Sequence, residues 1–319
     1  MTNNNFDLQT NLNLALQNIQ KRNFTEAIKL YENILKIYPR NFDANLNLGT
    51  IFAQNKNVKK ATEFWTKAIE INPNVPDAHN NLASAYISLN DNEKALEHIN
   101  KAININPNFS LAYNNLGIVN GKLGKTDEAI ISFLKAIEIQ PKNVMAYYNL
   151  ANSYQKINDI SNSEKCYLKV IDINPKFFSA YNNLMNLYER IGENKKLNEI
   201  IKNAEKYFEN DSSVKLFKGK LFFKSKQFEE AIKNLNTIKF DIENENKETT
   251  RCSTLAKCYD QIGNFDKAYE FFKKANETNY ILNKDKINKE KTINIIKDRI
   301  SFFENPKIKE WPKSKLINK

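Results

Sequence analysis

Five of the eight prolines lie 34 residues apart, and this spacing constrains the fold more than any other feature of the sequence. They are Pro39, Pro73, Pro107, Pro141 and Pro175. A fixed period of this length is typical of a repeat array, in which each unit packs on its neighbours and no central core is needed. Counting from Leu8 as position 1, regular units occupy 8–41, 42–75, 76–109, 110–143, 144–177 and 178–211.

Two weaker units follow, at 212–245 and 249–282, with Asn246, Lys247 and Glu248 between them. Within each unit, two runs of apolar residues have helical spacing, which predicts a helix, a turn and a second helix. The turn falls at position 15, where glycine or asparagine recurs, as a left-handed helix end favours. These residues are Asn90, Gly124, Asn158, Gly192 and Gly263. Small residues recur at position 8, where they let the paired helices approach closely.

The second unit shows the repeated pattern best: Leu48-Gly49, Phe52, Ala61, Trp65, Ala68 and Pro73. This pattern resembles the tetratricopeptide repeat, and the resemblance covers residues 8–282. It implies an all-α fold, a solenoid of helix–turn–helix units that forms a right-handed superhelix. The departures from the pattern are Asn120, Ser163, Met185 and Glu209, of which the last two predict looser or bent stacking from the sixth unit onward.

The resulting organisation is an N-terminal tail at 1–7, six regular units at 8–211 and two degenerate units at 212–282. A capping or linker helix is expected at 283–304, because apolar residues there form one stripe. A basic tail at 305–319 completes the chain. Residues 283–319 carry +6 of the net charge of +11, so the array itself is only mildly basic, and we expect no nucleic-acid partner.

The remaining composition predicts a cytoplasmic protein without metal or cofactor. No signal peptide or membrane span is expected, because the N-terminus lacks a basic and apolar leader and no apolar run is long enough. The cysteines Cys166, Cys252 and Cys258 form no metal-ligand pattern and read as reduced thiols. His79 is expected to pack between helices, and His98 to lie on a solvated helix face.

No residue is predicted to be catalytic. Six of the seven glycines occupy positions 8 or 15 and the seventh, Gly121, lies within a helix, so no glycine-rich phosphate loop is available. Acidic pairs such as Asp127-Glu128 fall at the start of second helices, where they interact with the helix dipole.

Position 6 is asparagine in all six regular units, although 51 asparagines in 319 residues would place about one there by chance. On a helix, positions 2, 6, 9 and 13 share a face, while the apolar positions 3, 7 and 14 point into the stack. We therefore expect the asparagines to line the concave groove, where an amide can both donate to and accept from a peptide backbone. The column consists of Asn13, Asn47, Asn81, Asn115, Asn149 and Asn183.

This column resembles the asparagine ladder in the repeat arm of O-linked N-acetylglucosamine transferases, which holds extended polypeptide. Alternatively, the amides only satisfy backbone groups or keep the groove hydrated. Position 13 carries Lys122, Lys156 and Arg190 in units four to six, where position 2 is partly apolar. The expected partner is an extended protein segment whose acidic or apolar part lies against units four to six.

Two classes of function remain open at this stage, with RNA binding as a third option disfavoured by aromatics that lie mainly at packing positions. One is a non-enzymatic protein–protein interaction scaffold. The other is the substrate-presenting arm of a sulfotransferase-type or glycosyltransferase-type enzyme whose catalytic domain lies outside this chain. Arrays of similar Asn/Lys-rich character precede bacterial sulfotransferase domains, but the loop that would bind the sulfate donor does not occur before Lys319.

Overall fold

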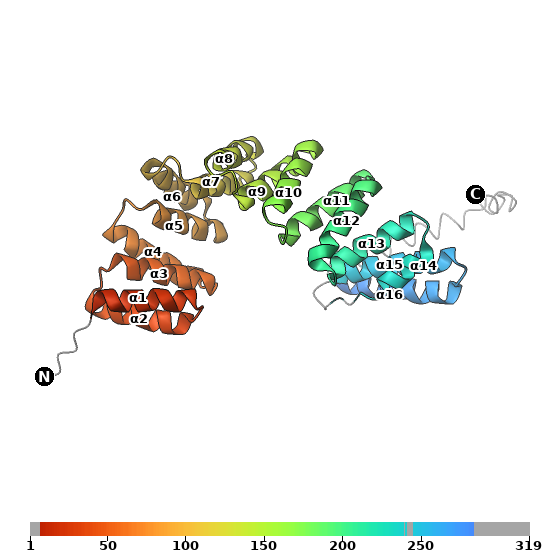
Figure 1. Ribbon diagram of the computed structural model, residues 1–319, viewed down its shortest axis with the longest axis horizontal. Coiled ribbons are helices and arrows are strands. Elements are labelled where there is room, and N and C mark those ends of the chain that lie inside the picture. The colour runs from red at the N-terminus through yellow and green to blue at the C-terminus, as the bar shows by residue number, and fades with distance from the viewer. Residues whose placement is uncertain (1–6, 239, 241–244, 284–319) are drawn as a thin grey trace, which may run out of the picture. The chain divides into compact units, whose positions relative to one another are not determined.

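The computed structural model describes residues 7–238, 240 and 245–283, which form sixteen helices in eight helix–turn–helix repeats (Figure 1). The first helices of the repeats are α1 (Leu8–Gln20), α3 (Phe42–Gln54), α5 (Pro76–Ser88), α7 (Ser110–Lys122), α9 (Val144–Lys156), α11 (Phe178–Ile191), α13 (Ser212–Lys224) and α15 (Glu245–Gln261). The second helices are α2 (Phe24–Ile37), α4 (Val58–Ile71), α6 (Asn92–Ile105), α8 (Thr126–Ile139), α10 (Ile160–Ile173), α12 (Asn194–Phe208), α14 (Phe228–Leu235) and α16 (Phe265–Asn283). The described residues contain no strand, and the predicted all-α solenoid is confirmed.

Three predicted segments fall largely outside the described residues. They are the N-terminal tail, of which only Asp7 is described, the helix expected at 283–304, of which only Asn283 is described, and the basic tail at 305–319. Asp7 is the N-cap of α1, and Asn283 is the last residue of α16.

Every repeat turns between its two helices through a residue with positive φ at position 15. The glycines Gly124, Gly192 and Gly263 have φ of 78–79°, as their type allows. The same geometry occurs at Arg22, Lys56, Asn90, Asn158 and Lys226, with φ of 59–61°. The sequence predicted this geometry only at glycine and asparagine. Arg22, Lys56 and Lys226 have no intrinsic preference for it, and they adopt it because the helices on either side require a tight turn.

The two helices of a repeat approach most closely where position 8 faces position 24. A Cβ added to Gly49 would lie 2.4 Å from the Trp65 ring, and one added to Gly117 would lie 2.5 Å from the Phe133 ring. The Trp65 indole also donates from Nε1 to the carbonyl oxygen of Leu46 at 3.1 Å, which fixes the ring against the first helix. These contacts explain why small residues recur at position 8.

The chain divides into two compact units, Met1–Leu187 and Tyr188–Lys319. In the first unit, successive first helices pack on one another, α1 on α3, α3 on α5, α5 on α7 and α7 on α9. The described second helices of this unit do not approach one another to the same extent. The first helices therefore lie on the inner side of the local curve, where positions 2, 6, 9 and 13 are presented.

The second unit contains a shortened repeat. Helix α14 has 8 residues, whereas the second helices of the first five repeats have 14. The residues Asn246, Lys247 and Glu248, expected to separate two repeats, instead lie in the first turn of α15.

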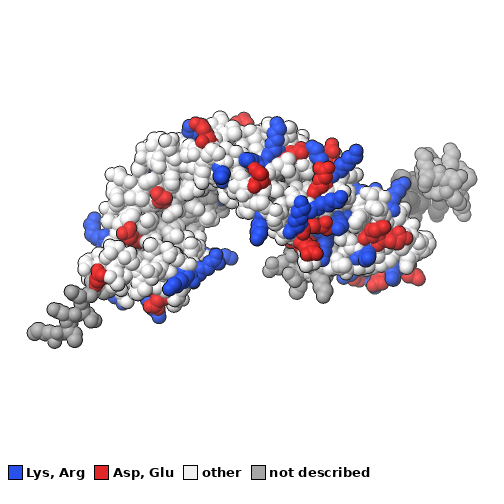
Figure 2. All heavy atoms as spheres, in the orientation of Figure 1, with Lys and Arg blue, Asp and Glu red and all other residues white. Residues whose placement is uncertain are grey.

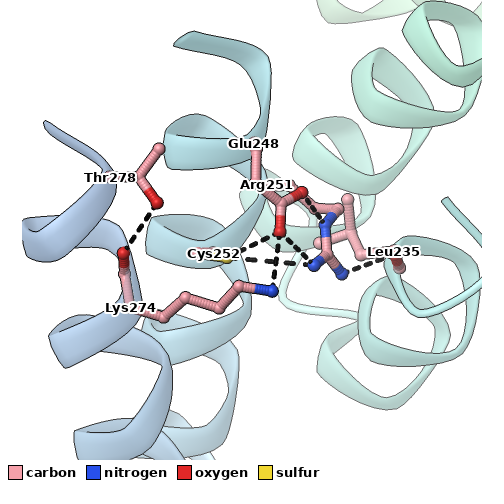
Figure 3. A network of polar contacts seen from close by, with 6 residues as sticks. All are labelled: Leu235, Glu248, Arg251, Cys252, Lys274 and Thr278. Atoms are coloured by element: carbon pink, nitrogen blue, oxygen red, sulfur yellow. Dashed lines mark hydrogen bonds and ion pairs between the residues drawn. The ribbon is translucent and has the colours of Figure 1, made fainter. Parts of the chain in front are cut away.

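A polar network joins this short helix to the next repeat (Figure 3). The Arg251 guanidinium donates from Nη1 to the carbonyl oxygen of Leu235, the last residue of α14, at 3.3 Å. The Glu248 carboxylate accepts from Arg251 at 2.6 and 2.7 Å and pairs with Lys274 of α16 at 3.0 Å. These bonds hold the pKa of Glu248 at about 2, below its ordinary 4.5, chiefly because Arg251 donates to the charged carboxylate.

Candidate functional site

The asparagine column runs along the first helices of the repeats, and its members differ in exposure. Asn13 of α1, in the first described repeat, is exposed. Asn47, Asn81, Asn149 and Asn183 are half-buried, and only 9% of Asn115 is exposed. Neighbouring first helices therefore cover much of the column.

Three of these amides bond to the preceding repeat. Asn115 donates from Nδ2 to the Asn80 side-chain oxygen at 2.8 Å, and Asn149 donates to the Asn114 side-chain oxygen at 3.1 Å. Asn183 donates to the hydroxyl of Tyr148 at 3.2 Å and also lies 3.1 Å from the Asn152 side-chain oxygen and 3.1 Å from the Tyr167 hydroxyl. All three asparagines thus have an acceptor at position 5 of the repeat before, 35 residues earlier.

The sequence pattern indicated the asparagines that donate these bonds, but it did not indicate the position 5 residues that accept them. The available signal was position 5 itself. It is leucine in the first two repeats (Leu12, Leu46) and carries an amide or a hydroxyl in the third to fifth (Asn80, Asn114, Tyr148). Asn47 and Asn81 follow those leucines, and neither side-chain amide makes a hydrogen bond among the described residues. A polar residue at position 5 therefore coincides with a bonded asparagine in the next repeat.

The lysines at position 13 also reach back by one repeat. The Lys122 ammonium donates to the carbonyl oxygen of Ile87 at 2.6 Å and to the side-chain oxygen of Asn90 at 2.8 Å. The Lys156 ammonium donates to the carbonyl oxygen of Gly121 at 3.3 Å. Both acceptor carbonyls belong to the last turn of the preceding first helix, where a cation interacts favourably with the helix dipole. Both lysine side chains remain exposed.

Arg190 is exposed and belongs to the second unit. The other predicted site residues, from Asn13 to Asn183 with Lys122 and Lys156, all belong to the first unit.

An apolar edge accompanies the two lysines. Leu111 of α7 is 48% exposed and Met145 of α9 is 47% exposed, and both occupy position 2 of helices that pack side by side. Ile118, at position 9 of α7, is half-buried on the same face. Large apolar side chains left half exposed at one position of adjacent repeats gain stability when a partner covers them.

The two histidines form a pair in the third repeat, and the prediction that His98 lies on a solvated face is wrong. His98 is half-buried, stacks on Tyr86 with centroids 5.7 Å apart, and has its Nδ1 3.0 Å from His79 Nδ1. His79 is 3% exposed, and its Nε2 lies 2.9 Å from the carbonyl oxygen of Pro73. Because that oxygen can only accept, His79 carries its proton on Nε2, and His98 donates to His79 Nδ1.

Burial lowers the pKa of both imidazoles below 6.5, and for His98 the neighbouring His79 adds to the effect. The neutral pair is therefore the form that fits the fold. It packs α5 against α6 and does not face the inner side of the array.

The described residues show no other arrangement suited to chemistry. They contain no group of three or more His, Cys, Asp or Glu side chains that could hold a metal ion. Cys166, Cys252 and Cys258 are free and buried, and burial raises the pKa of each thiol to about 11. No described helix is long and apolar enough to cross a membrane.

Several solved structures are similar to this chain. The MamA structure is 26% identical, with a TM-score of 0.45, and the match covers 51% of this chain and 95% of that one. PilW, a type IV pilus biogenesis factor, is 19% identical with a TM-score of 0.59, and the match covers 65% of this chain and 96% of that one. A tetratricopeptide repeat protein from Parabacteroides merdae is 20% identical with a TM-score of 0.55, and the match covers 79% of this chain and 98% of that one. The last two likenesses show the fold, and no curated protein sequence matches the chain.

Family models carry the assignment further. Models described as tetratricopeptide repeat match residues 12–76, 76–109, 98–131, 144–177 and 251–280, and one described as TPR repeat matches 122–158. Together these matches cover more than half of the chain. They span most of the first compact unit and residues 251–280 of the second. The 34-residue period, the close approach of the helices at position 8 and the turn at position 15 agree with these matches. The chain belongs to the tetratricopeptide repeat family.

Proposed function

We propose that the chain is a non-enzymatic scaffold that binds an extended segment of a partner protein along the inner face of the first unit. The observation that carries this proposal is the half-exposed pair Leu111 and Met145, at one position of two adjacent first helices, beside the exposed Lys122 and Lys156. Apolar surface of this kind supplies affinity, and nearby cations select acidic residues. The partner segment is expected to combine apolar and acidic side chains.

The asparagines have a more limited part in this proposal than their spacing alone suggested. One donor of Asn115 and of Asn149 is already bonded inside the protein, while the amide has a second donor and an acceptor. Asn81 makes no hydrogen bond within the described residues and offers its whole amide. In this proposal the asparagines position the backbone of the bound segment. Leu111 and Met145, together with Lys122 and Lys156, provide most of the selectivity for apolar and acidic segments over other peptides.

The experiment probes the full chain against an array of extended peptides that vary independently in acidic and apolar content. The variant Leu111→Ser/Met145→Ser should weaken capture by about tenfold, since two half-exposed apolar side chains together contribute about 1.5 kcal/mol. The matched control is Ile131→Ser/Leu134→Ser, which removes two exposed apolar side chains, 67% and 46% exposed, from the second helix α8. Equal loss in both variants, or no loss in the first, would overturn the proposal.

A further inference from the structure

The seventh repeat breaks the leucine column that packs the other repeats together. Position 7 is leucine in the first six repeats and Lys218 in the seventh. Leu48, Leu82, Leu150 and Leu184 are at most 2% exposed, so this position normally fills the space between consecutive repeats. A lysine cannot fill that space, because its ammonium must reach solvent or an ion partner.

The Lys218 side chain is 35% exposed, and its ammonium pairs with Glu205 of α12 at 2.7 Å. Beside this pair, a hollow of about 480 Å³ opens between α12 and α13. Lys195, Lys202 and Phe222 are among the residues that line it, and Ile201 and Leu221 form part of its apolar floor. The loss of one leucine thus coincides with a groove at a position where four other repeats bury their leucine.

A second hollow of about 430 Å³ shares Lys218 and Phe222 with the first and continues toward α14. Together the two hollows are lined by five lysines and three glutamates. Lys195 and Lys202 are exposed and make no ion pair within the described residues, whereas Lys218 is already neutralised by Glu205. Figure 2 shows lysine and arginine side chains over this part of the second unit, interleaved with acidic ones.

We propose that this α12–α13 groove, lined by Lys195, Lys202, Lys218 and Phe222, binds an acidic peptide segment of a partner protein. Carboxylates of the segment pair with Lys195 and Lys202, and an apolar side chain of the segment packs on the Phe222 ring. The two joined hollows are open along their length, as an extended chain requires. The groove also presents Glu205, Glu209 and Glu230, which repel the continuous charge of a nucleic acid but are tolerated by a peptide whose acidic residues are spaced.

This groove is separate from the inner face proposed above. Its lining residues occupy positions 7, 10, 11 and 14 of a first helix and positions of the preceding second helix, whereas the inner face uses positions 2, 6, 9 and 13. It also lies in the other compact unit. Variants of one surface leave the other unchanged, so the two proposals succeed or fail independently.

The test measures fluorescence anisotropy of a labelled twelve-residue peptide in which glutamates are spaced by leucines, at low salt. The full chain carries Leu111→Ser/Met145→Ser throughout, so that the apolar edge of the inner face does not contribute to binding. Lys195→Gln/Lys202→Gln should raise the Kd about tenfold, because two exposed ion pairs together contribute about 1.4 kcal/mol. The matched control, Lys21→Gln/Lys59→Gln, makes the same charge change on exposed lysines of the first unit and should leave the Kd within about twofold.

A second variant, Lys218→Leu/Glu205→Gln, restores the leucine column and removes the carboxylate that would lose its partner. The leucine should pack on Ile201 and Leu221 and narrow the groove. Peptide binding should then weaken while the helical circular dichroism stays intact, which separates loss of the groove from loss of folding. Three results would overturn the proposal. The control pair could weaken binding equally, or a peptide with glutamine in place of glutamate could bind equally well. A single-stranded oligonucleotide could also compete more strongly than the unlabelled peptide.

Discussion

Asn115 of the fourth repeat donates a buried hydrogen bond to the side-chain oxygen of Asn80 in the third, across 2.8 Å. Asn115 is 9% exposed and Asn80 is 7% exposed, so water replaces this bond poorly. A bond at this depth contributes to holding neighbouring repeats together, in addition to any contact with a partner.

Replacing Asn115 by Ala should therefore destabilise the fold by about 1–2 kcal/mol, because the Asn80 oxygen is left buried without its donor. Urea unfolding followed by circular dichroism measures the change. Asn13→Ala is the matched control, because Asn13 lies at the same repeat position, is exposed and donates no side-chain hydrogen bond among the described residues. Its effect should stay within about 0.5 kcal/mol. A double-mutant cycle with Asn80→Ala should give a coupling of about 1 kcal/mol, and a coupling near zero would contradict the role of the bond.

The left-handed turn residues give a second prediction. Lys56 has φ of 61°, a conformation that costs a side-chain-bearing residue roughly 1–2 kcal/mol. Lys56→Gly should therefore raise the free energy of unfolding by about 0.5–1 kcal/mol, after the greater freedom of glycine in the unfolded chain is subtracted.

Thermal unfolding of this variant is compared with that of Glu63→Gly, which places glycine at an exposed interior position of α4. The control should lose about 1 kcal/mol. If both glycine variants are destabilised alike, the strain assigned to Lys56 is absent.

This turn also shows what the sequence could predict. The period, the helix pairs and the small residues at position 8 were predictable, because glycine, alanine and proline report directly on backbone geometry and close approach. Arg22 and Lys56 carry no such signal, since their left-handed geometry is imposed by the helices on either side. The Asn115–Asn80 bond and the His79–His98 pair were missed for a related reason: their partners lie 35 and 19 residues away, and only packing brings them together.

The histidine pair predicts a loss of stability in mild acid. Both pKa values are lowered in the folded protein, so below pH 6.5 the unfolded chain binds more protons and the free energy of unfolding falls. Protonation of both imidazoles leaves two donors facing each other at the Nδ1 atoms, which breaks the bond between His79 and His98.

The variant His79→Tyr/His98→Leu introduces the residues that other repeats carry at these positions, Tyr113 and Leu30. Melting temperatures measured between about pH 7.5 and pH 5.5 should fall more steeply for the wild type than for this variant. Parallel profiles for the two proteins would rule out the pair as the source of acid sensitivity.

Glu248 predicts a second loss of stability at lower pH. Its pKa is lowered from 4.5 to about 2, so its contribution is complete above about pH 4.5 and is lost as the pH falls toward 2. With the side chain 19% exposed, this shift corresponds to about 2–3 kcal/mol in the second unit.

Glu248→Gln keeps the size of the side chain and removes the charge. Urea unfolding at about pH 6, 4 and 3 should show the wild type losing this advantage over the variant as the pH falls. Lys274→Gln serves as the comparison, because it removes only the exposed partner of Glu248 and leaves Arg251 in place. A constant difference between wild type and Glu248→Gln across this range would contradict the assigned pKa.

The backward-reaching bonds of the first unit all run in one direction along the chain. Asn115, Lys122, Asn149, Lys156 and Asn183 are the donors, and every acceptor lies in the repeat made earlier by the ribosome. The fourth repeat therefore donates to the third and accepts from the fifth, so each of these bonds forms only when two adjacent repeats have docked. Removing one internal repeat would break such bonds on both of its sides.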